Sequence, residues 1–305
     1  MTTVLSALLP IALILALGKL VAARKVLSAE GWIGLEQITY FVLFPALIVS
    51  KLAVADFDGV DWRMPTALVG AQVLLATLSI VLAAILGQSR DRMGVFIQSA
   101  ARWNTFIALA LAQDILGPAG LALMVVAAAA MIPTANVISV AALMHYTNRG
   151  VKPLEMLRQL AINPLVLACA IGLAINFADL PLPRMGMDIL DVLAQATIAL
   201  GLLTTGAAIQ IKQQSAPPLA VMSWSALRLL GLPLIAGGLA LTLNVSPDVF
   251  SVILIATAVP TAVNGTILAR QLGADAGLAA NLIACQTFFA IVTITLVLWV
   301  GTLVI

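Results

Sequence analysis

The sequence predicts an all-α polytopic membrane protein with ten transmembrane helices, and three observations carry that prediction. Of its 305 residues, 62% are hydrophobic and only 9% are charged, so the chain has more apolar surface than one water-soluble core buries and must be solvated by lipid. Runs of about 20 apolar residues, long enough to cross the hydrocarbon layer as helices, recur along nearly the whole chain. The charge of the short connections between these runs alternates from one connection to the next.

The apolar runs place helices at 3 to 23, 33 to 54, 65 to 87, 95 to 116, 119 to 146, 161 to 179, 186 to 210, 217 to 243, 248 to 271 and 277 to 303. The fourth helix is the weakest membrane segment, because Arg102, Asn104, Gln113 and Asp114 lie within or beside it. These same polar residues become informative when the breaks in the helices are considered.

The loop charges orient the chain. The odd-numbered loops carry most of the basic residues, whereas the even-numbered loops carry only Arg63 and Arg184. The basic residues of the odd loops are Arg24, Lys25, Arg90, Arg92, Arg149, Lys152, Arg158, Lys212 and Arg270. Because cytoplasmic loops are enriched in Lys and Arg, we expect the odd loops in the cytoplasm, both termini outside it, and the chain in the inner membrane.

The longest polar connection divides the chain into two halves of five helices. We expect a first repeat at 1–148, a cytoplasmic connecting loop at 149–160 and a second repeat at 161–305. An odd number of helices in each half forces opposite orientations. The segment 116–122 is echoed, with one insertion, by 272–279, which places the joint between the fourth and fifth helices on that between the ninth and tenth. Inverted repeats of this kind are typical of secondary transporters.

Two helices carry breaks at corresponding places in the halves. One break is Ala100–Thr105 in the fourth helix, and the other is Val259–Thr266 in the ninth. Pro260 lacks a backbone N–H and clashes with the preceding turn, and Gly265 loosens the next turn. The amide groups of Asn104 and Asn264, with Thr105 and Thr261 beside them, are predicted to line a substrate site at the gap, where the N-termini of half-helices favour an anion.

Charges within the spans have two interpretations. An arginine inside a membrane span is costly and marks either a site or a structural pair. Arg102 is expected either to bind a carboxylate bidentately or to be held by a structural partner or snorkel. For Arg228 in the eighth helix a structural pair or snorkelling is favoured. Glu36 in the second helix is also intramembrane.

Four further positions are secondary candidates for the site, and one of them is Gln286 in the tenth helix. The segment 132–136 contains Pro133 and predicts a kink in the fifth helix, with Asn136 as a possible ligand. Pro45 in the second helix and Thr204 in the seventh lie at counterpart positions of the two halves. Small and hydroxylic residues there permit close helix packing and are candidates to line the pocket.

Other functional classes find little support. Cys169 and Cys285 lie in apolar runs and are interpreted as packing residues, and His145, the single histidine, as a solvated interfacial side chain. Neither a metal site nor a pair of catalytic groups is expected, and therefore no enzyme. The net charge of +2 with dispersed basic residues excludes a nucleic-acid partner.

These residues resemble the bacterial branch of the auxin efflux carrier (PIN-like) family, within the superfamily that also contains bile acid:sodium symporters. The resemblance covers essentially the whole chain. Its most specific parts are Arg102–Ile107 and the stretch from Pro260 through Asn264 to Gly273, with Gln286 and Thr287 after it. A departure is Trp103, where plant members have a proline before the crossover asparagine.

The resemblance implies two inverted five-helix repeats whose broken fourth and ninth helices cross at the substrate site. It also implies a scaffold of helices 1, 2, 6 and 7 and a transport domain of helices 3, 4, 5, 8, 9 and 10. By position, Asn104 is similar to the family's crossover asparagine and Pro260 to its crossover proline.

The expected function is therefore secondary transport, in the direction of efflux, of a small organic anion such as a mono- or dicarboxylate, by elevator-type alternating access. The alternative is a sodium-coupled symporter, with Gln286, Asn264 and Thr261 as ion ligands. No cofactor is expected, and the coupling ion, proton or sodium, stays open. The expected partners are the anion and the lipid bilayer, and a homodimer is left open.

Overall fold

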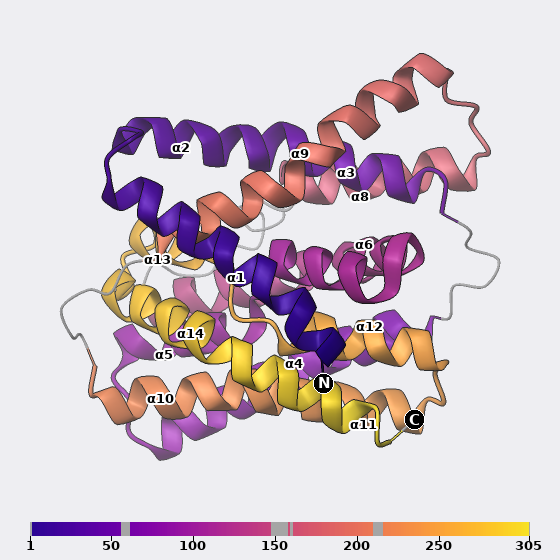
Figure 1. Cartoon of the computed structure of the whole chain (residues 1–305). Coiled ribbons are helices and arrows are strands. Elements are labelled where there is room, and N and C mark those ends of the chain that lie inside the picture. Colours follow the sequence, from indigo (N-terminus) through magenta and orange to yellow (C-terminus); the bar gives the residue numbers. More distant parts are fainter. Residues whose placement is uncertain (1, 56–61, 148–157, 159–160, 210–215, 305) are drawn as a thin grey trace.

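A computed structural model describes residues 2–55, 62–147, 158, 161–209 and 216–304. In this part of the chain every regular element is helical and there is no strand (Figure 1). The elements are α1 Thr2–Ala23, α2 Ala29–Ile38, the π-helix η1 Thr39–Leu43, α3 Phe44–Leu52, α4 Arg63–Ile85, α5 Arg90–Ala101, α6 Thr105–Tyr146, α8 Pro164–Phe177, α9 Arg184–Ala208, α10 Pro218–Ala226, the π-helix η2 Leu227–Gly231, α11 Leu232–Thr242, α12 Pro247–Ala258, α13 Gly265–Gln271 and α14 Ala276–Gly301. Most of the predicted connecting loop at 149–160 lies outside the described residues.

The all-helical membrane class is confirmed. Within the described residues, seven continuous helical stretches are long and apolar enough to cross a membrane, and α8 and α12 are shorter apolar helices. Large hydrophobic side chains such as Leu13, Leu234 and Phe288 are exposed on the outside of the bundle, as expected of a surface that meets lipid. The count of ten and the inverted repeat stay predictions, because one stretch runs from Arg90 to Tyr146 and contains the expected fourth and fifth helices together.

Prolines shape two of the spans through π-helical turns. In the second span η1 precedes Phe44–Pro45, and in the eighth η2 precedes Leu232–Pro233. A proline has no N–H to continue the α-helical pattern, and a wider π-turn absorbs the mismatch without breaking the helix. Pro45 therefore has a structural explanation.

The predicted kink at Pro133 is not a break. Within α6 only Gly117 leaves helical geometry, with φ 67° and ψ −158°. This is a backbone conformation that glycine adopts readily, and it turns the chain at the expected joint between the fourth and fifth helices. The backbone stays helical through Pro133.

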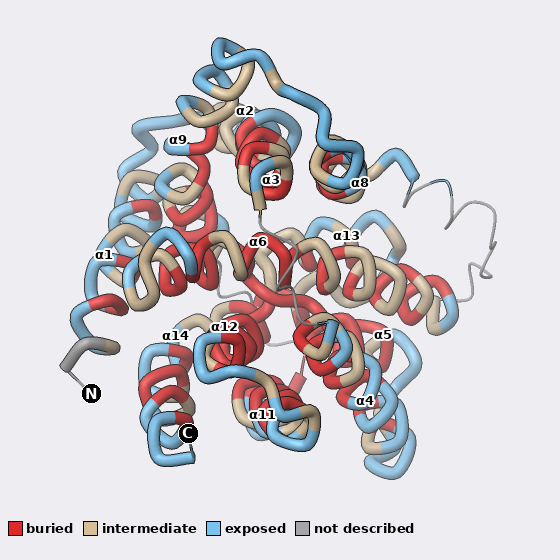
Figure 2. The backbone as a smooth tube through the Cα atoms, turned by 90° about the vertical axis from the view of Figure 1, so that its right-hand side faces the viewer, coloured by how far each residue is buried: buried red, intermediate tan, exposed pale blue. Residues whose placement is uncertain are grey.

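The helices form two groups with α6 and α13 between them (Figure 1). One group contains α1, α2, α3, α8 and α9, and the other contains α4, α5, α10, α11, α12 and α14. The first group corresponds to helices 1, 2, 6 and 7, which the family resemblance assigns to a scaffold. Buried residues concentrate at the centre, where α6 and α12 lie, and exposed residues lie around the periphery (Figure 2).

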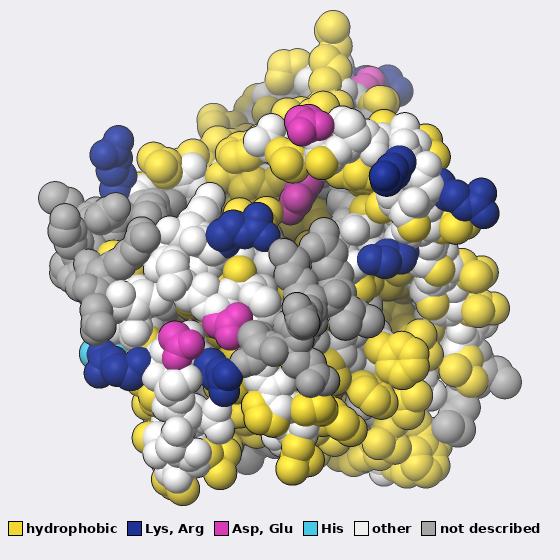
Figure 3. Space-filling view, turned by 90° about the vertical axis from the view of Figure 1, so that its left-hand side faces the viewer, with side chains coloured by type: hydrophobic (Ala, Val, Ile, Leu, Met, Phe, Trp, Pro, Cys, Tyr) yellow, Lys and Arg dark blue, Asp and Glu magenta, His cyan; other side chains and the backbone are white. Residues whose placement is uncertain are grey.

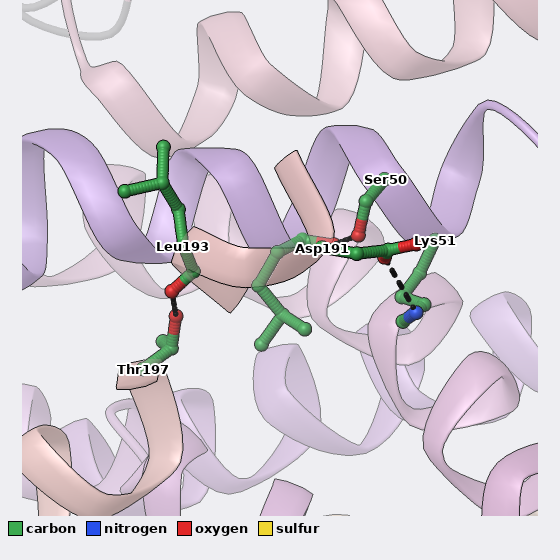
Figure 4. A network of polar contacts seen from close by, with 6 residues as sticks. Ser50, Lys51, Asp191, Leu193 and Thr197 are labelled. Atoms are coloured by element: carbon green, nitrogen blue, oxygen red, sulfur yellow. Dashed lines mark hydrogen bonds and ion pairs between the residues drawn. The ribbon is translucent and has the colours of Figure 1, made fainter. Parts of the chain in front are cut away.

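Close packing fixes α9 within the first group. Lys51 Nζ on α3 forms an ion pair with Asp191 Oδ1 on α9 at 3.1 Å, and Thr197 Oγ1 donates to Leu43 O at 2.9 Å. Figure 4 shows the ion pair, and the two contacts together place α9 antiparallel to the second span. On its other side α9 meets α1 so closely that a Cβ added to Gly206 would collide with the backbone of Leu15.

We expect Gly206→Ala to destabilise the protein, because the new methyl group meets backbone, which cannot move aside. Overpacking of this kind costs about 1–3 kcal/mol, visible as a lower thermal denaturation midpoint in detergent. Gly186→Ala, on the same helix but with open space around its Cβ, is the control and is expected to leave the midpoint unchanged or slightly raised. Equal midpoints for the two variants would contradict this account of the α1–α9 contact.

Candidate functional site

The two broken helices meet at the centre of the molecule. The backbone is extended at Arg102, between α5 and α6, and helix is absent from Val259 to Asn264, between α12 and α13. Asn104 N–H donates to Pro260 O at 2.7 Å, which ties one interruption to the other. The predicted breaks at 100–105 and 259–266 are therefore adjacent in space.

Glutamine side chains connect the segments on either side of the breaks. Gln98 Nε2 on α5 donates to Gly265 O at 3.1 Å. On α14, Gln286 Oε1 accepts from Thr261 N–H and Gln286 Nε2 donates to Ser99 Oγ, both at 2.9 Å. All of these hydrogen bonds join segments that are far apart in sequence. They therefore hold the two interruptions together and also give buried polar groups a partner.

The carboxyl ends of the half-helices are held from the third and eighth spans. Gln72 Nε2 on α4 donates to Ala101 O at 2.9 Å. Arg228, in η2, donates from Nε to Arg102 O at 3.1 Å and from Nη1 to Thr257 O at 2.6 Å. Arg228 is 0% exposed. Carbonyls at a helix C-terminus carry partial negative charge, so this arginine is structural, as the sequence favoured, although its partners are carbonyl oxygens.

Arg102 is held differently from Arg228. Its three guanidinium nitrogens donate to Ser139 Oγ at 3.1 Å, Asn264 Oδ1 at 2.7 Å and Asn136 Oδ1 at 3.0 Å. Every one of these acceptors is a neutral side-chain oxygen, and in the described part of the chain no carboxylate pairs with Arg102. The guanidinium is thus fixed in direction while its charge stays unneutralised. Both sequence interpretations apply, because the arginine is structurally held and also lines a cavity.

A cavity of about 80 Å³ lies beside the crossover and adjoins a recess of about 340 Å³. Arg102, Asn136 and Asn264 line both spaces. The remaining lining residues of the first come from the first group of helices, from α6 and from the two interruptions: Glu36, Thr39, Tyr40, Phe44, Trp103, Asn104, Thr105, Phe106, Ile132, Ala135, Leu165, Thr204, Thr205, Ala262 and Val263.

The structure separates the predicted site residues into two sets. Those that line the cavity are Arg102, Asn104, Thr105, Asn136, Thr204 and Asn264. Those that do not line it are Pro45, Pro260, Thr261, Gly265 and Gln286. Of the second set, all but Pro45 build the crossover through the hydrogen bonds described above. The ligand roles of both sets stay predictions.

Sequence reasoning missed the residues that support the crossover and the aromatic part of the lining. Gln72 and Gln98 are amides within apolar runs, and that is a signal in itself because buried polar groups in membrane helices require partners. Tyr40, Phe44, Trp103 and Phe106 carry no such signal, because aromatic residues in apolar runs are ordinary packing residues. Only the three-dimensional arrangement brings them to one cavity.

Comparison with known proteins gives one family. A family model described as membrane transport protein matches residues 3–298, which is nearly the whole chain. The comparison with curated proteins gives no match.

We expect Gln286→Leu to weaken the crossover, because Thr261 N–H and Ser99 Oγ would lose a buried partner. Leaving a buried group unsatisfied costs about 1–3 kcal/mol, which lowers the thermal denaturation midpoint. The control is Thr287→Val on the next residue, whose hydroxyl bonds only within its own helix. Stability equal to that of the control would show that the Gln286 hydrogen bonds contribute nothing.

Proposed function

The chain belongs to the membrane transport protein family, the auxin efflux carrier or PIN-like family, and we propose that it is a secondary transporter of a small organic anion such as a mono- or dicarboxylate. The observation that carries the proposal is the fixed, unneutralised charge of Arg102 in the cavity. A buried cation is costly at membrane depth unless an anion approaches it. A carboxylate would be that anion, because a guanidinium binds carboxylates in a planar, directional manner.

The groups around Arg102 suit a carboxylate. Asn104 Oδ1 accepts from Ile107 N–H as the N-cap of α6, which leaves the amide nitrogen of Asn104 to donate. Thr105 and Phe106, the first two residues of α6, also line the cavity, and N–H groups in a first helical turn lack intrahelical partners. The partial positive charge at this helix N-terminus adds to the charge of Arg102.

The position of the cavity suits alternating access. One wall consists of Arg102, Asn104 and Asn264 at the crossover, and the other includes Tyr40, Thr204 and residues near them from the first group of helices. Relative movement of the two groups would carry a bound anion with the crossover, which is an elevator-type mechanism. Efflux is the direction proposed, in line with the family.

The recess points to the side from which the site is open. It reaches Gln271, the last residue of α13, at the end of the molecule where α1 turns into α2. Figure 3 shows this end, which is hollowed and has several Lys and Arg side chains on its surface. Because basic loops mark the cytoplasmic side, we assign the recess to the cytoplasm.

Sodium coupling, the alternative, has no observation in its favour. It would draw on the oxygens of Gln286 and Asn264 and on Thr261. Gln286 Oε1 already accepts from Thr261 N–H, and Asn264 Oδ1 accepts from the cationic Arg102. A sodium ion there would displace these donors and lie against a positive charge.

We expect mono- and dicarboxylates, with benzoate and malonate as the first probes, to raise the thermal denaturation midpoint of the purified protein. Asn104→Asp should abolish the shift, because the new carboxylate still caps α6 but removes the amide donor and repels the anion. Asn244→Asp, the same chemical change in an exposed loop, is the control. If the carboxylates raise the midpoint of Asn104→Asp as much as that of the wild type, the crossover is not part of the binding site.

Transport should not depend on sodium. In proteoliposomes, flux of radiolabelled benzoate or malonate is expected to be the same in sodium and potassium buffers of equal ionic strength. A several-fold loss of flux without sodium would favour the symporter.

A further inference from the structure

We propose that Glu36 is a proton-binding site linked to the anion site, so that an anion entering from the open recess binds together with one proton. The proposal rests on the proposed function. Glu36 lies on α2 and lines the same cavity as Arg102. It is half-buried, and within the described residues its carboxyl group has neither an ion pair nor a hydrogen bond. Among the described residues that line the cavity, Glu36 is the only one with a carboxyl group.

The packing of α2 places Glu36 on the wall opposite the crossover. The contact of Lys51 with Asp191 (Figure 4) and that of Leu43 with Thr197 set an antiparallel register between the second span and α9. Continued along the helices, this register brings Glu36 opposite Thr204 and Thr205, which line the cavity with it.

The other charged and titratable groups near Glu36 can be assigned. On η1, Tyr40 lines the cavity, and its hydroxyl accepts from Asn163 Nδ2. The ionisable residues of α9 lie towards the start of that helix, and its cavity-lining residues are the two threonines. On α2 itself, Glu30 is in the exposed first turn. Across the cavity, Arg102 is the one cation among the lining residues that the structure describes.

Electrostatics then links the proton to the anion. An ionised Glu36 faces the cavity that a carboxylate must enter, so two negative charges would share one arginine. A like charge at short range disfavours ionisation, and a proton taken from the water of the recess onto a Glu36 oxygen removes the repulsion. The empty cavity holds Arg102 with ionised Glu36, and the filled cavity holds Arg102, the anion and neutral Glu36. For an anion with a single negative charge, the two forms carry the same net charge.

This linkage has a direction. Acidification of the compartment that the recess faces favours the neutral form of Glu36 and tightens anion binding. By the topology proposed above that compartment is the cytoplasm, where an accumulating organic acid would itself lower the pH. The carrier would therefore bind its substrate best when export is most needed.

The test uses the purified full-length protein and the tighter binder of benzoate and malonate, titrated calorimetrically from about pH 6 to 8, where the carboxyl of benzoate is ionised throughout. For malonate, the titration of its second carboxyl group is subtracted. In the wild type the affinity should fall as the pH rises. The steepest fall should be about tenfold per pH unit, which is the slope for one proton bound with one anion. Titrations in two buffers of different ionisation enthalpy should show uptake of one proton.

Glu36→Gln should bind the anion without proton uptake and at pH 8 as tightly as at pH 6, which makes it a tighter binder than the wild type at high pH. A gain of affinity distinguishes this role from a structural one, because a damaged fold does not bind better. Glu30→Gln, on the same helix but in its exposed first turn, should keep the pH dependence of the wild type.

Two results would overturn the proposal, and they differ from failure of the anion site. A wild type that binds the carboxylate with no proton uptake removes the linkage and leaves the anion site intact. Unchanged proton uptake in Glu36→Gln assigns the proton elsewhere. If neither carboxylate binds the wild type, the anion site itself is wrong, and the linkage with it.

Discussion

The structure depends on supplying partners for the backbone groups that two broken helices leave at the centre of an apolar molecule. In a membrane interior there is no bulk water to take up free carbonyl and N–H groups, so each interruption must be satisfied by protein. Gln72, Gln98, Gln286 and Arg228 do this from four different helices, and Asn104 N–H binds Pro260 O directly. The two interruptions therefore depend on these side chains for their hydrogen bonds.

The two intramembrane arginines show how the same residue type serves different purposes. Arg228 is completely buried, and two of its nitrogens donate to carbonyl oxygens at helix ends, where the partial negative charge of the backbone favours a cation. Arg102 donates to side-chain oxygens of two asparagines and a serine, and it faces a cavity. Neutral acceptors fix its orientation without neutralising it. That difference makes Arg102 the better candidate for binding an anion.

The sequence predicted the breaks well and their surroundings poorly, for a physical reason. Proline, glycine and polar residues within apolar runs are local signals, and they located the interruptions around Arg102 and Pro260 and the joint near Gly117. The partners of those interruptions are non-local. Gln98 meets Gly265 O across 167 positions, and nothing in the residues around Gln98 specifies that encounter. At Pro133 the backbone stays helical, so the structure has no interruption there, and the kink stays a prediction.

If the chain works as proposed, the arrangement of charge also connects anion binding to movement. Arg102 and the residues that hold it belong to α6 and to the interruptions themselves, so the guanidinium is rigidly attached to the crossover. Glu36 belongs to α2, on the opposite wall. With the cavity empty, opposite charges attract the two walls to each other. A bound anion neutralises Arg102, and the attraction weakens. An anion would therefore lower the free energy of separating the walls without altering a packing contact, which is how a ligand that interacts differently with two states shifts the population between them.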